Sequence, residues 1–172
     1  MIRKMKIRET LQKGFTLIEL LVVITIISIL TVVTVSQFQT AKKKANDVAR
    51  KGDINAVSKS LLMYFNDYGQ FPDPSDIVWG GTFQDATTSP PYVYMKTLPK
   101  ENYLTNKPYC YKISADGKKF ALYAQLENTV DNECDRNNNN QADDDVLMCG
   151  GVGYCYAVTS PNTSLSANGD IQ

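Results

Sequence analysis

The spacing of apolar residues divides the chain into two parts. From Phe15 to Val35 the sequence is apolar almost without interruption, and Glu19 is its one charged residue. A helix of these 21 residues is about 31 Å long, close to the thickness of the hydrocarbon layer of a bilayer. The pattern predicts a transmembrane or otherwise apolar-packed helix over residues 15–37.

From Phe38 onward apolar residues recur every three or four positions, as on one face of an amphipathic helix. Gly69 and Pro72 then supply a helix stop. One helix from Phe15 to about Tyr68 is therefore predicted, with Arg50 among the polar residues between the apolar ones. The predicted apolar stripe consists of Phe38, Ala41, Ala45, Val48, Gly52, Ile54, Val57, Leu61, Tyr64, Phe65 and Tyr68.

Three strand-like segments follow the helix. Tyr109–Ser114 and Phe120–Leu126 are rich in β-forming residues and are joined through Asp116-Gly117, a strong hairpin signal. Gly153–Thr159 is the third segment. We expect a small antiparallel sheet packed on the helix, which is an α+β fold.

The expected domains are a leader of residues 1–14, the helix of residues 15–37, and a head of residues 38–172. Six of the seven prolines lie in residues 70–108, which are predicted to be loop-rich. The polar tail, residues 160–172, is predicted to fray.

Charge is distributed unevenly. Residues 1–14 carry five basic side chains and one acidic one, so the positive-inside rule predicts that the N-terminus stays in the cytoplasm and the head lies outside. The whole chain has 18 basic and 18 acidic side chains; without residues 1–14 it has 13 and 17, a net charge near −4. An acidic chain argues against nucleic acid as the main partner.

Glu19 lies within the apolar segment, where a carboxylate costs about 2.5–3.5 kcal/mol near the middle of a span and less near its end. A cut between Gly14 and Phe15 would supply a partner, because it leaves an ammonium group at Phe15, one helical turn from Glu19. Residues 36–44, after the apolar segment, are a poor match to the small-x-small site of a secretory signal.

The sequence Lys13-Gly14-Phe15-Thr16-Leu17-Ile18-Glu19-Leu20-Leu21 resembles the leader and mature N-terminus of the type IV pilin superfamily. That superfamily includes type IV pilins and the pseudopilins of type II secretion and competence systems, and the resemblance is close over residues 13–40. It implies that a prepilin peptidase cuts after Gly14, that Phe15 is N-methylated, and that Glu19 pairs with the N-terminal amine of a neighbouring subunit.

The resemblance also implies where the chain resides and what it binds. The subunit would be held in the cytoplasmic membrane by lipid and then assembled by an inner-membrane platform into an extracytoplasmic filament. Its partners there would be further copies and related minor pilins or pseudopilins. Pilus, secretion pseudopilus and competence filament stay open: Leu98-Pro99 before the strands resembles secretion pseudopilins, and a cysteine-closed C-terminal loop resembles pilins. The alternative hypothesis is a membrane-anchored binding module, for Ca²⁺ or another ligand, that does not polymerise.

All four cysteines follow the apolar segment, and an even number on the oxidising side of a membrane predicts disulfide bonds. Three pairings are possible. We expect Cys134 to pair with Cys149, closing the polar loop. We expect Cys110 to pair with Cys155, because their Tyr-Cys-Tyr settings suggest neighbouring strands.

Residues 131–145 form an acidic loop dense in oxygen ligands, of which Ca²⁺ takes six to eight. Their spacing follows that of an EF-hand, but Asn140 replaces its glycine and Val146 its bidentate glutamate. Secretion pseudopilins are similar in carrying a calcium site in a C-terminal loop; the alternative is a solvated loop. The candidate ligands are Asp135, Asn137, Asn139 and Asp143, with Gln141 in the same register.

An enzyme is not expected. The chain has no histidine, so it offers no Ser-His or Cys-His pair and no imidazole metal ligand. It also lacks a phosphate-binding glycine loop. The sequence therefore predicts a structural protein without catalytic residues, with Ca²⁺ as its one candidate cofactor.

Overall fold

The computed structural model describes residues 14–172 apart from 86, 103–106, 129–130, 135–146 and 167, and describes no side chains at 32–36. Its first element is the helix α1, Leu17–Tyr68, of 52 residues. The chain forms two compact units, which divide between Gln39 and Thr40. α1 contributes residues to both units, and each unit is described by itself.

α1 begins with a reciprocal pair of hydrogen bonds. The backbone N–H and the hydroxyl of Thr16 donate to Glu19 Oε2 at 2.8 and 2.7 Å, and the N–H of Glu19 donates to Thr16 Oγ1 at 3.3 Å. This is a capping box, which satisfies N–H groups that lack partners inside the helix. At the other end, Gly69 has a φ of 68° and its N–H donates to the Phe65 carbonyl at 2.7 Å. The predicted glycine stop is confirmed.

In the first unit the apolar side chains of α1 are exposed. Phe15 is 86 % exposed, Leu30 is 61 % exposed, and the large apolar residues between them are all at least 47 % exposed. The hydroxyls of Ser28 and Thr31 donate to carbonyls one turn back, which satisfies them within an apolar helix. Among the described residues, no helix combines the length and the apolar character needed to cross a membrane. The span predicted over residues 15–37 stays a prediction.

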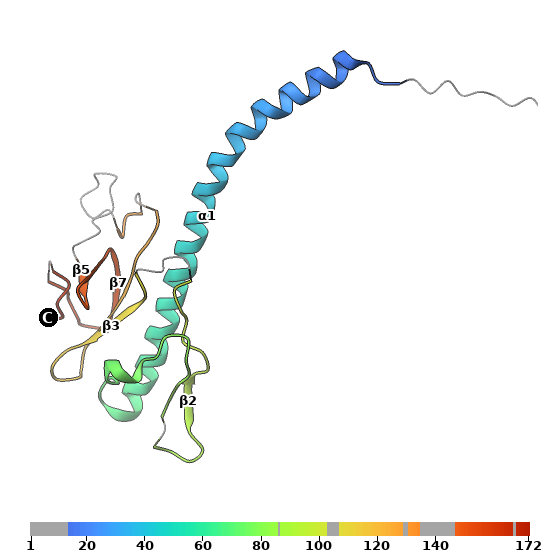
Figure 1. Cartoon of the computed structure of the whole chain (residues 1–172). Coiled ribbons are helices and arrows are strands. Elements are labelled where there is room, and N and C mark those ends of the chain that lie inside the picture. Colours follow the sequence, from blue (N-terminus) through green and yellow to red (C-terminus); the bar gives the residue numbers. More distant parts are fainter. Residues whose placement is uncertain (1–13, 86, 103–106, 129–130, 135–146, 167) are drawn as a thin grey trace, which may run out of the picture. The chain divides into compact units, whose positions relative to one another are not determined.

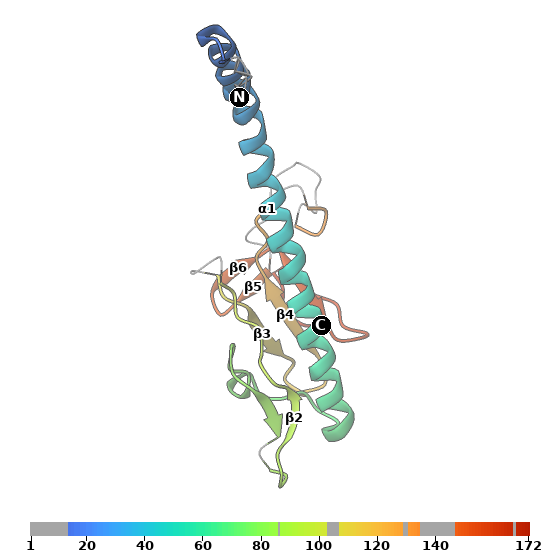
Figure 2. The ribbon, with the colours of Figure 1, turned by 90° about the vertical axis from the view of Figure 1, so that its right-hand side faces the viewer.

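The second unit packs the rest of α1 against a three-stranded antiparallel sheet in the order β3-β4-β7 (Figures 1 and 2). The turn between β3 and β4 contains Asp116-Gly117, with Gly117 at a φ of 66°. The predicted α+β fold and the predicted hairpin are thus confirmed. The strands are β3 (Cys110–Ile113), β4 (Phe120–Ala124) and β7 (Tyr156–Thr159).

Two smaller antiparallel pairs, β1-β2 and β5-β6, complete the described strands. Gly153–Thr159, predicted as one strand, is divided at Cys155, so that β6 pairs with β5 and β7 pairs with β4. The β1-β2 pair lies in the region predicted to be loop-rich. The remaining elements are the 3-10 helix η1 (Pro74–Asp76), β1 (Phe83–Asp85), β2 (Tyr92–Met95), β5 (Leu147–Cys149) and β6 (Val152–Tyr154).

The buried face of α1 differs from the predicted stripe at its start. Ile54 and Leu61 are completely buried, as predicted. Val48, which was assigned to the stripe, is 70 % exposed, whereas Arg50, which was assigned to the polar face, is 1 % exposed. Steps of three and four residues backward from Ile54 lead to Arg50 and Asp47. The prediction from hydrophobicity was wrong at the start of this face, because charged residues can be buried when they are paired.

Every residue of β4 is buried, because the strand contributes to two cores. Phe120, Leu122 and Ala124 belong to the main core, which lies between the sheet and α1. Ala121 and Tyr123 point to the opposite face and belong to a second core. The alternation of strand side chains therefore places apolar residues on both sides of the sheet.

The second core is covered by β5, β6 and the C-terminal tail, and Figure 1 shows β5 on the side of the sheet away from α1. Leu165 and Ile171 pack in this core and form an isolated β-bridge. The hydroxyl of Tyr123 donates to the Gly169 carbonyl at 2.6 Å. The prediction that residues 160–172 fray was wrong, because two apolar residues in a polar segment suffice to close this core.

Two disulfide bonds are present, but their pairing differs from the predicted one. Cys110 is bonded to Cys149, with 6.2 Å between Cα atoms, and Cys134 is bonded to Cys155, with 4.7 Å. The predicted pairs, Cys134 with Cys149 and Cys110 with Cys155, were wrong. Cys110 in β3 and Cys155 before β7 are not on neighbouring strands, because β4 lies between β3 and β7. The two Tyr-Cys-Tyr segments are neighbours of the same strand and not of each other.

Candidate functional site

The first candidate site is the segment at the start of α1. Gly14 and Phe15 precede the helix, and both are exposed. No atom lies within 4 Å of the position that a Cβ on Gly14 would take. The two residues that form the Gly14-Phe15 peptide bond are therefore exposed in the described part of the chain.

The Glu19 carboxylate, in the first turn of α1, is positioned by Thr16. Both residues follow Gly14, so their capping box is kept after a cut at that residue. The cut would create an ammonium group at Phe15. A positive charge at a helix N-terminus is disfavoured by the helix macrodipole, so this ammonium requires a carboxylate nearby.

The second candidate site is a cluster of charges, here called the Arg50 hub, formed by Asp47, Arg50, Glu101 and Glu127. Arg50 donates to Asp47 at 2.7 Å, to the two oxygens of Glu101 at 2.7 and 3.2 Å, and to Glu127 at 2.7 Å. The carboxylates come from α1, from the segment after β2 and from the segment after β4. One planar guanidinium thus fastens two loops to the helix.

The hub is held by further hydrogen bonds, and its contacts shift the pKa values of Arg50 and Glu127. Asp47 accepts hydrogen bonds from the backbone N–H groups of Glu127 and Asn128, both at 2.8 Å. Burial alone would lower the pKa of Arg50, but hydrogen bonds to Glu101 and Glu127 outweigh it and raise that pKa. Burial alone would raise the pKa of Glu127, and the hydrogen bond from Arg50 reverses this and lowers it. Arg50 and Glu127 are both charged at neutral pH.

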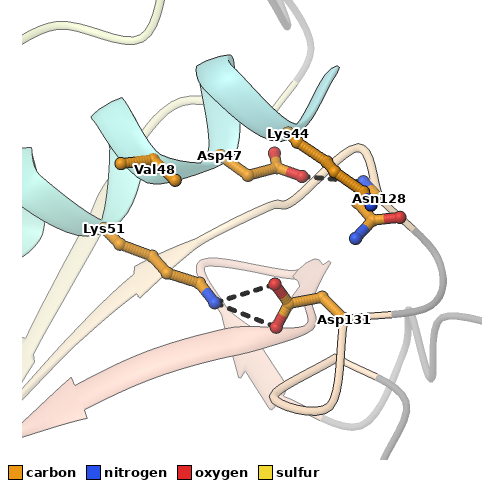
Figure 3. A pocket seen from close by; sticks show the side chains of 6 residues that line it. All are labelled: Lys44, Asp47, Val48, Lys51, Asn128 and Asp131. Atoms are coloured by element: carbon orange, nitrogen blue, oxygen red, sulfur yellow. Dashed lines mark hydrogen bonds and ion pairs between the residues drawn. The ribbon is translucent and has the colours of Figure 1, made fainter. Parts of the chain in front are cut away.

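A pocket of about 190 Å³ lies beside the hub (Figure 3). On one side, the Lys51 ammonium bonds both oxygens of Asp131 at 2.9 Å and contacts Glu133. This contact fastens the beginning of the acidic loop to α1. Lys44 and the exposed Val48 line the other side, and among the described residues Lys44 forms no salt bridge.

The calcium prediction concerns residues that lie outside those the structure describes. These are Asp135, Asn137, Asn139 and Asp143, within the acidic loop. Elsewhere, in the described part of the chain, no three His, Cys, Asp or Glu side chains gather as metal ligands would. The Ca²⁺ site stays a prediction.

Sequence reasoning did not find the Arg50 hub. The sequence did contain a signal for it. The three- and four-residue spacing of the buried face continues toward the N-terminus through two charged residues, which are three positions apart. A basic and an acidic residue at that spacing can pair within a helix and so share a buried position. The positions concerned are Asp47, Arg50, Ile54, Val57 and Leu61.

Comparison with known proteins bears on the first site directly. Residues 10–35, which include Gly14, Phe15 and Glu19, match the family described as the prokaryotic N-terminal methylation motif. Over 136 residues the chain is 30 % identical to the type II secretion system core protein G of Pseudomonas aeruginosa. The aligned region covers 74 % of this chain and 94 % of that protein. The chain belongs to the pilin and pseudopilin superfamily. No solved structure matches this pilin-like subunit.

Membership of the pilin and pseudopilin superfamily settles the class of function. The subunit is a structural protein and not an enzyme. Membership also implies a stage anchored at a membrane and association with other pilins or pseudopilins in a filament. In the described part of this pilin-like subunit, the large apolar side chains of α1 from Leu17 to Leu30 are exposed.

Proposed function

We propose that the chain is a subunit of a type II secretion pseudopilus, or of a similar type IV pilus-like filament, made as a precursor and cut between Gly14 and Phe15. The observation that carries this proposal is the exposed bond between these residues, placed directly before an apolar helix with Glu19 in its first turn. The enzyme that cuts this bond is a prepilin peptidase.

The cut changes the charge at the helix start. It removes the basic leader, residues 1–14, and leaves an amine at Phe15 that is then N-methylated. Methylation of an amine keeps its positive charge. The mature helix therefore begins with a cation and carries a carboxylate at Glu19, one turn later.

This pair of charges defines the register of assembly. An unpaired carboxylate among apolar helices is costly, and the attraction between opposite charges is stronger where water is excluded. The Phe15 amine of one subunit and the Glu19 carboxylate of a neighbour can form an ion pair only when the two helices are displaced along the filament axis by one particular distance. The exposed apolar side chains from Leu17 to Leu30 then pack against neighbouring helices in the filament, as they do against lipid before assembly. The inner-membrane platform transfers the subunit between these two states.

The type of filament is proposed from two observations. The Pseudomonas relative is named as a core protein of the type II secretion system, and the alignment covers 94 % of it. Leu98, in the Leu-Pro pair that resembles secretion pseudopilins, is completely buried in the main core. Both observations favour a secretion pseudopilus.

Processing is tested by co-expression of the chain with a prepilin peptidase. We expect intact-mass measurement to show the loss of 14 residues and a methyl group on Phe15. Gly14→Glu should block the cut, because a side chain with charge replaces the residue at the cleaved bond. Gly52→Ala, at an exposed glycine within α1, is the matched control and should be cut normally. Normal cutting of the Gly14 variant would contradict the assigned site.

Assembly is tested with Glu19→Ala. We expect this variant to be cut normally. Its filament yield should fall at least about tenfold, because the neighbouring amine loses its partner. Glu9→Ala is the control, since the cut removes residue 9, and it should assemble normally. Filaments of normal yield from Glu19→Ala would contradict the role of this carboxylate. An uncut protein that stays monomeric would favour the membrane-anchored binding module instead.

A further inference from the structure

Three consecutive lysines, Lys42, Lys43 and Lys44, lie in the part of α1 that belongs to the second unit, and all are exposed. Because successive residues are rotated by about 100° around a helix, they form a collar rather than a stripe. None of them forms a salt bridge with another described residue. By contrast, Arg50 and Lys51, about two turns further along the helix, are both paired.

Four aspartates lie where α1 ends and the following elements begin. The described partners of Asp67, Asp73 and Asp85 are hydroxyl and amide groups. No described lysine or arginine forms a salt bridge with any of the four. Hydrogen bonds from Thr87 and Tyr68 lower the pKa of Asp85 to about 2, so that carboxylate keeps its charge. Both views show β2 beside the end of α1 (Figures 1 and 2). The four are Asp67 in α1, Asp73 and Asp76 at η1, and Asp85 in β1.

The lysine collar and the group of four aspartates therefore carry opposite charges. From Lys43 to Asp67 the helix advances 24 residues, or about 36 Å. The β3-β4 turn adds Asp116, Lys118 and Lys119 to the acidic end, because the Phe71 N–H donates to the Gly117 carbonyl at 2.8 Å. Five carboxylates against two ammonium groups leave that end negative.

Each end also exposes apolar side chains. Val48, beside Lys44, is 70 % exposed. At the acidic end, Met63 and Tyr92 are 48 % and 51 % exposed, and they line an open pocket of about 390 Å³ together with Asp67. Apolar side chains rimmed by complementary charge are the usual composition of a protein interface.

We propose that the lysine collar of one copy of this chain docks on the aspartate end of the next copy, with both heads pointing in the same direction. The partner is a second copy, because a single chain carries both complementary surfaces. A contact between two different surfaces of identical subunits repeats without closing and gives a filament. This contact rests on the proposed filament function. Together with the ion pair at Glu19, it sets the displacement between neighbouring subunits along the filament.

The test uses two charge-reversed variants of the full chain, co-expressed with the peptidase. One carries Lys42→Glu, Lys43→Glu and Lys44→Glu, and the other carries Asp67→Lys, Asp73→Lys and Asp76→Lys. Each should be cut normally but give at least about tenfold fewer filaments, because like charges then meet at the contact. An equimolar mixture of the two, and a chain with all six substitutions, should regain filaments. Recovery in the mixture also shows that both variants fold.

The matched control reverses three exposed lysines outside the collar, with Lys59→Glu, Lys96→Glu and Lys100→Glu, and should assemble normally. Normal assembly of either reversed variant, no recovery in the mixture, or closed dimers in place of filaments would overturn the contact. So would a result in which only the lysine variant fails and it alone loses binding to vesicles of anionic lipid, since that assigns the collar to a lipid surface. A wild-type chain that is cut but forms no filament would overturn the proposed function together with this contact.

Discussion

A buried arginine is stable only when its charge is matched, and Arg50 is matched by three carboxylates. Two of these, on Asp47 and Glu101, are almost completely buried, whereas the side chain of Glu127 keeps 22 % of its surface exposed. The excess negative charge of the hub is therefore partly solvated, and Asp47 is further stabilised by two backbone N–H groups. Each hub residue depends on the others.

Replacing Arg50 by methionine should destabilise the head strongly. The substitution leaves three carboxylates without their cation, and breaking a buried ion pair in this way costs about 3–5 kcal/mol. Urea unfolding of the full chain in detergent micelles, followed by circular dichroism, measures this loss. Lys44→Met is the control and should change the free energy of unfolding by less than about 0.5 kcal/mol, because Lys44 is exposed. A loss below about 1 kcal/mol for Arg50→Met would show that the hub is not a major source of stability.

Glu127 makes the stability of the head sensitive to acid. Its pKa in the folded chain is lowered from 4.5, so its contribution is complete above that value and is lost as the pH falls through the lower, folded value. We expect the thermal midpoint of the chain to drop as the pH is lowered from about 5 to about 3. Glu127→Gln should have a lower midpoint near neutral pH and a flatter dependence on acid. An unchanged slope in this variant would mean that Glu127 does not contribute.

At the scale of elements, the two disulfide bonds stabilise different parts of the head. The Cys110–Cys149 bond joins β3 to β5 and so ties the outer layer to the sheet. The Cys134–Cys155 bond holds the segment after β4 to the residue before β7. Together with the Lys51 contact to Asp131, the second bond fixes the beginning of the acidic loop near α1.

The pairing is testable by mass spectrometry of the unreduced chain. Trypsin cannot separate Cys149 from Cys155, because no lysine or arginine lies between them, but chymotrypsin cuts after Tyr154. A double digest should give one peptide that joins Cys110 to Cys149 and another that joins Cys134 to Cys155. A peptide joining Cys110 to Cys155 would contradict the strand order. Digestion after reduction is the control, and both linked peptides should disappear from it.

Two glycines should respond to substitution in opposite directions. A Cβ at Gly169, where φ is 79°, would lie 2.8 Å from the Cα of Leu147, so Gly169→Ala should cost about 1–3 kcal/mol and loosen the tail. Gly52 is helical with no atom within 4 Å of its Cβ position, so Gly52→Ala should stabilise by about 0.5–1 kcal/mol. Urea unfolding checks both. Equal stability of the two variants would contradict the close approach at the tail.

At the scale of the whole molecule, features set by neighbouring residues were predictable and features set by strand order were not. Gly69 as the helix stop and the Asp116-Gly117 turn depend on local backbone geometry, and both are present. The first half of the buried face depends on Glu101, which is 51 residues from Arg50 along the chain. The cysteine pairing likewise depends on β4 lying between two strands that looked alike in sequence. The spacing of Asp47 and Arg50 is a local signal, but the pairing with Glu101 and the pairing of the cysteines leave no local pattern.

The segment proposed for processing and assembly has a local sequence pattern. The predicted leader, the predicted cut at Gly14 and the charge pattern around Glu19 lie within a few residues of one another, and the methylation-motif family matches residues 10–35. The capping box adds Thr16, whose Thr-x-x-Glu spacing to Glu19 is also a local signal. The lysine collar and the aspartate end are separately visible in sequence, but only the fold brings the four aspartates to one end of the head.

Helical reconstruction of the assembled filament at side-chain resolution tests the central claim most directly. The account predicts a subunit that begins at Phe15, with its amine within about 4 Å of the Glu19 carboxylate of a neighbouring subunit, as in an ion pair. A filament built from chains that still begin at Met1, or one in which Glu19 bonds only to its own Thr16, would contradict it.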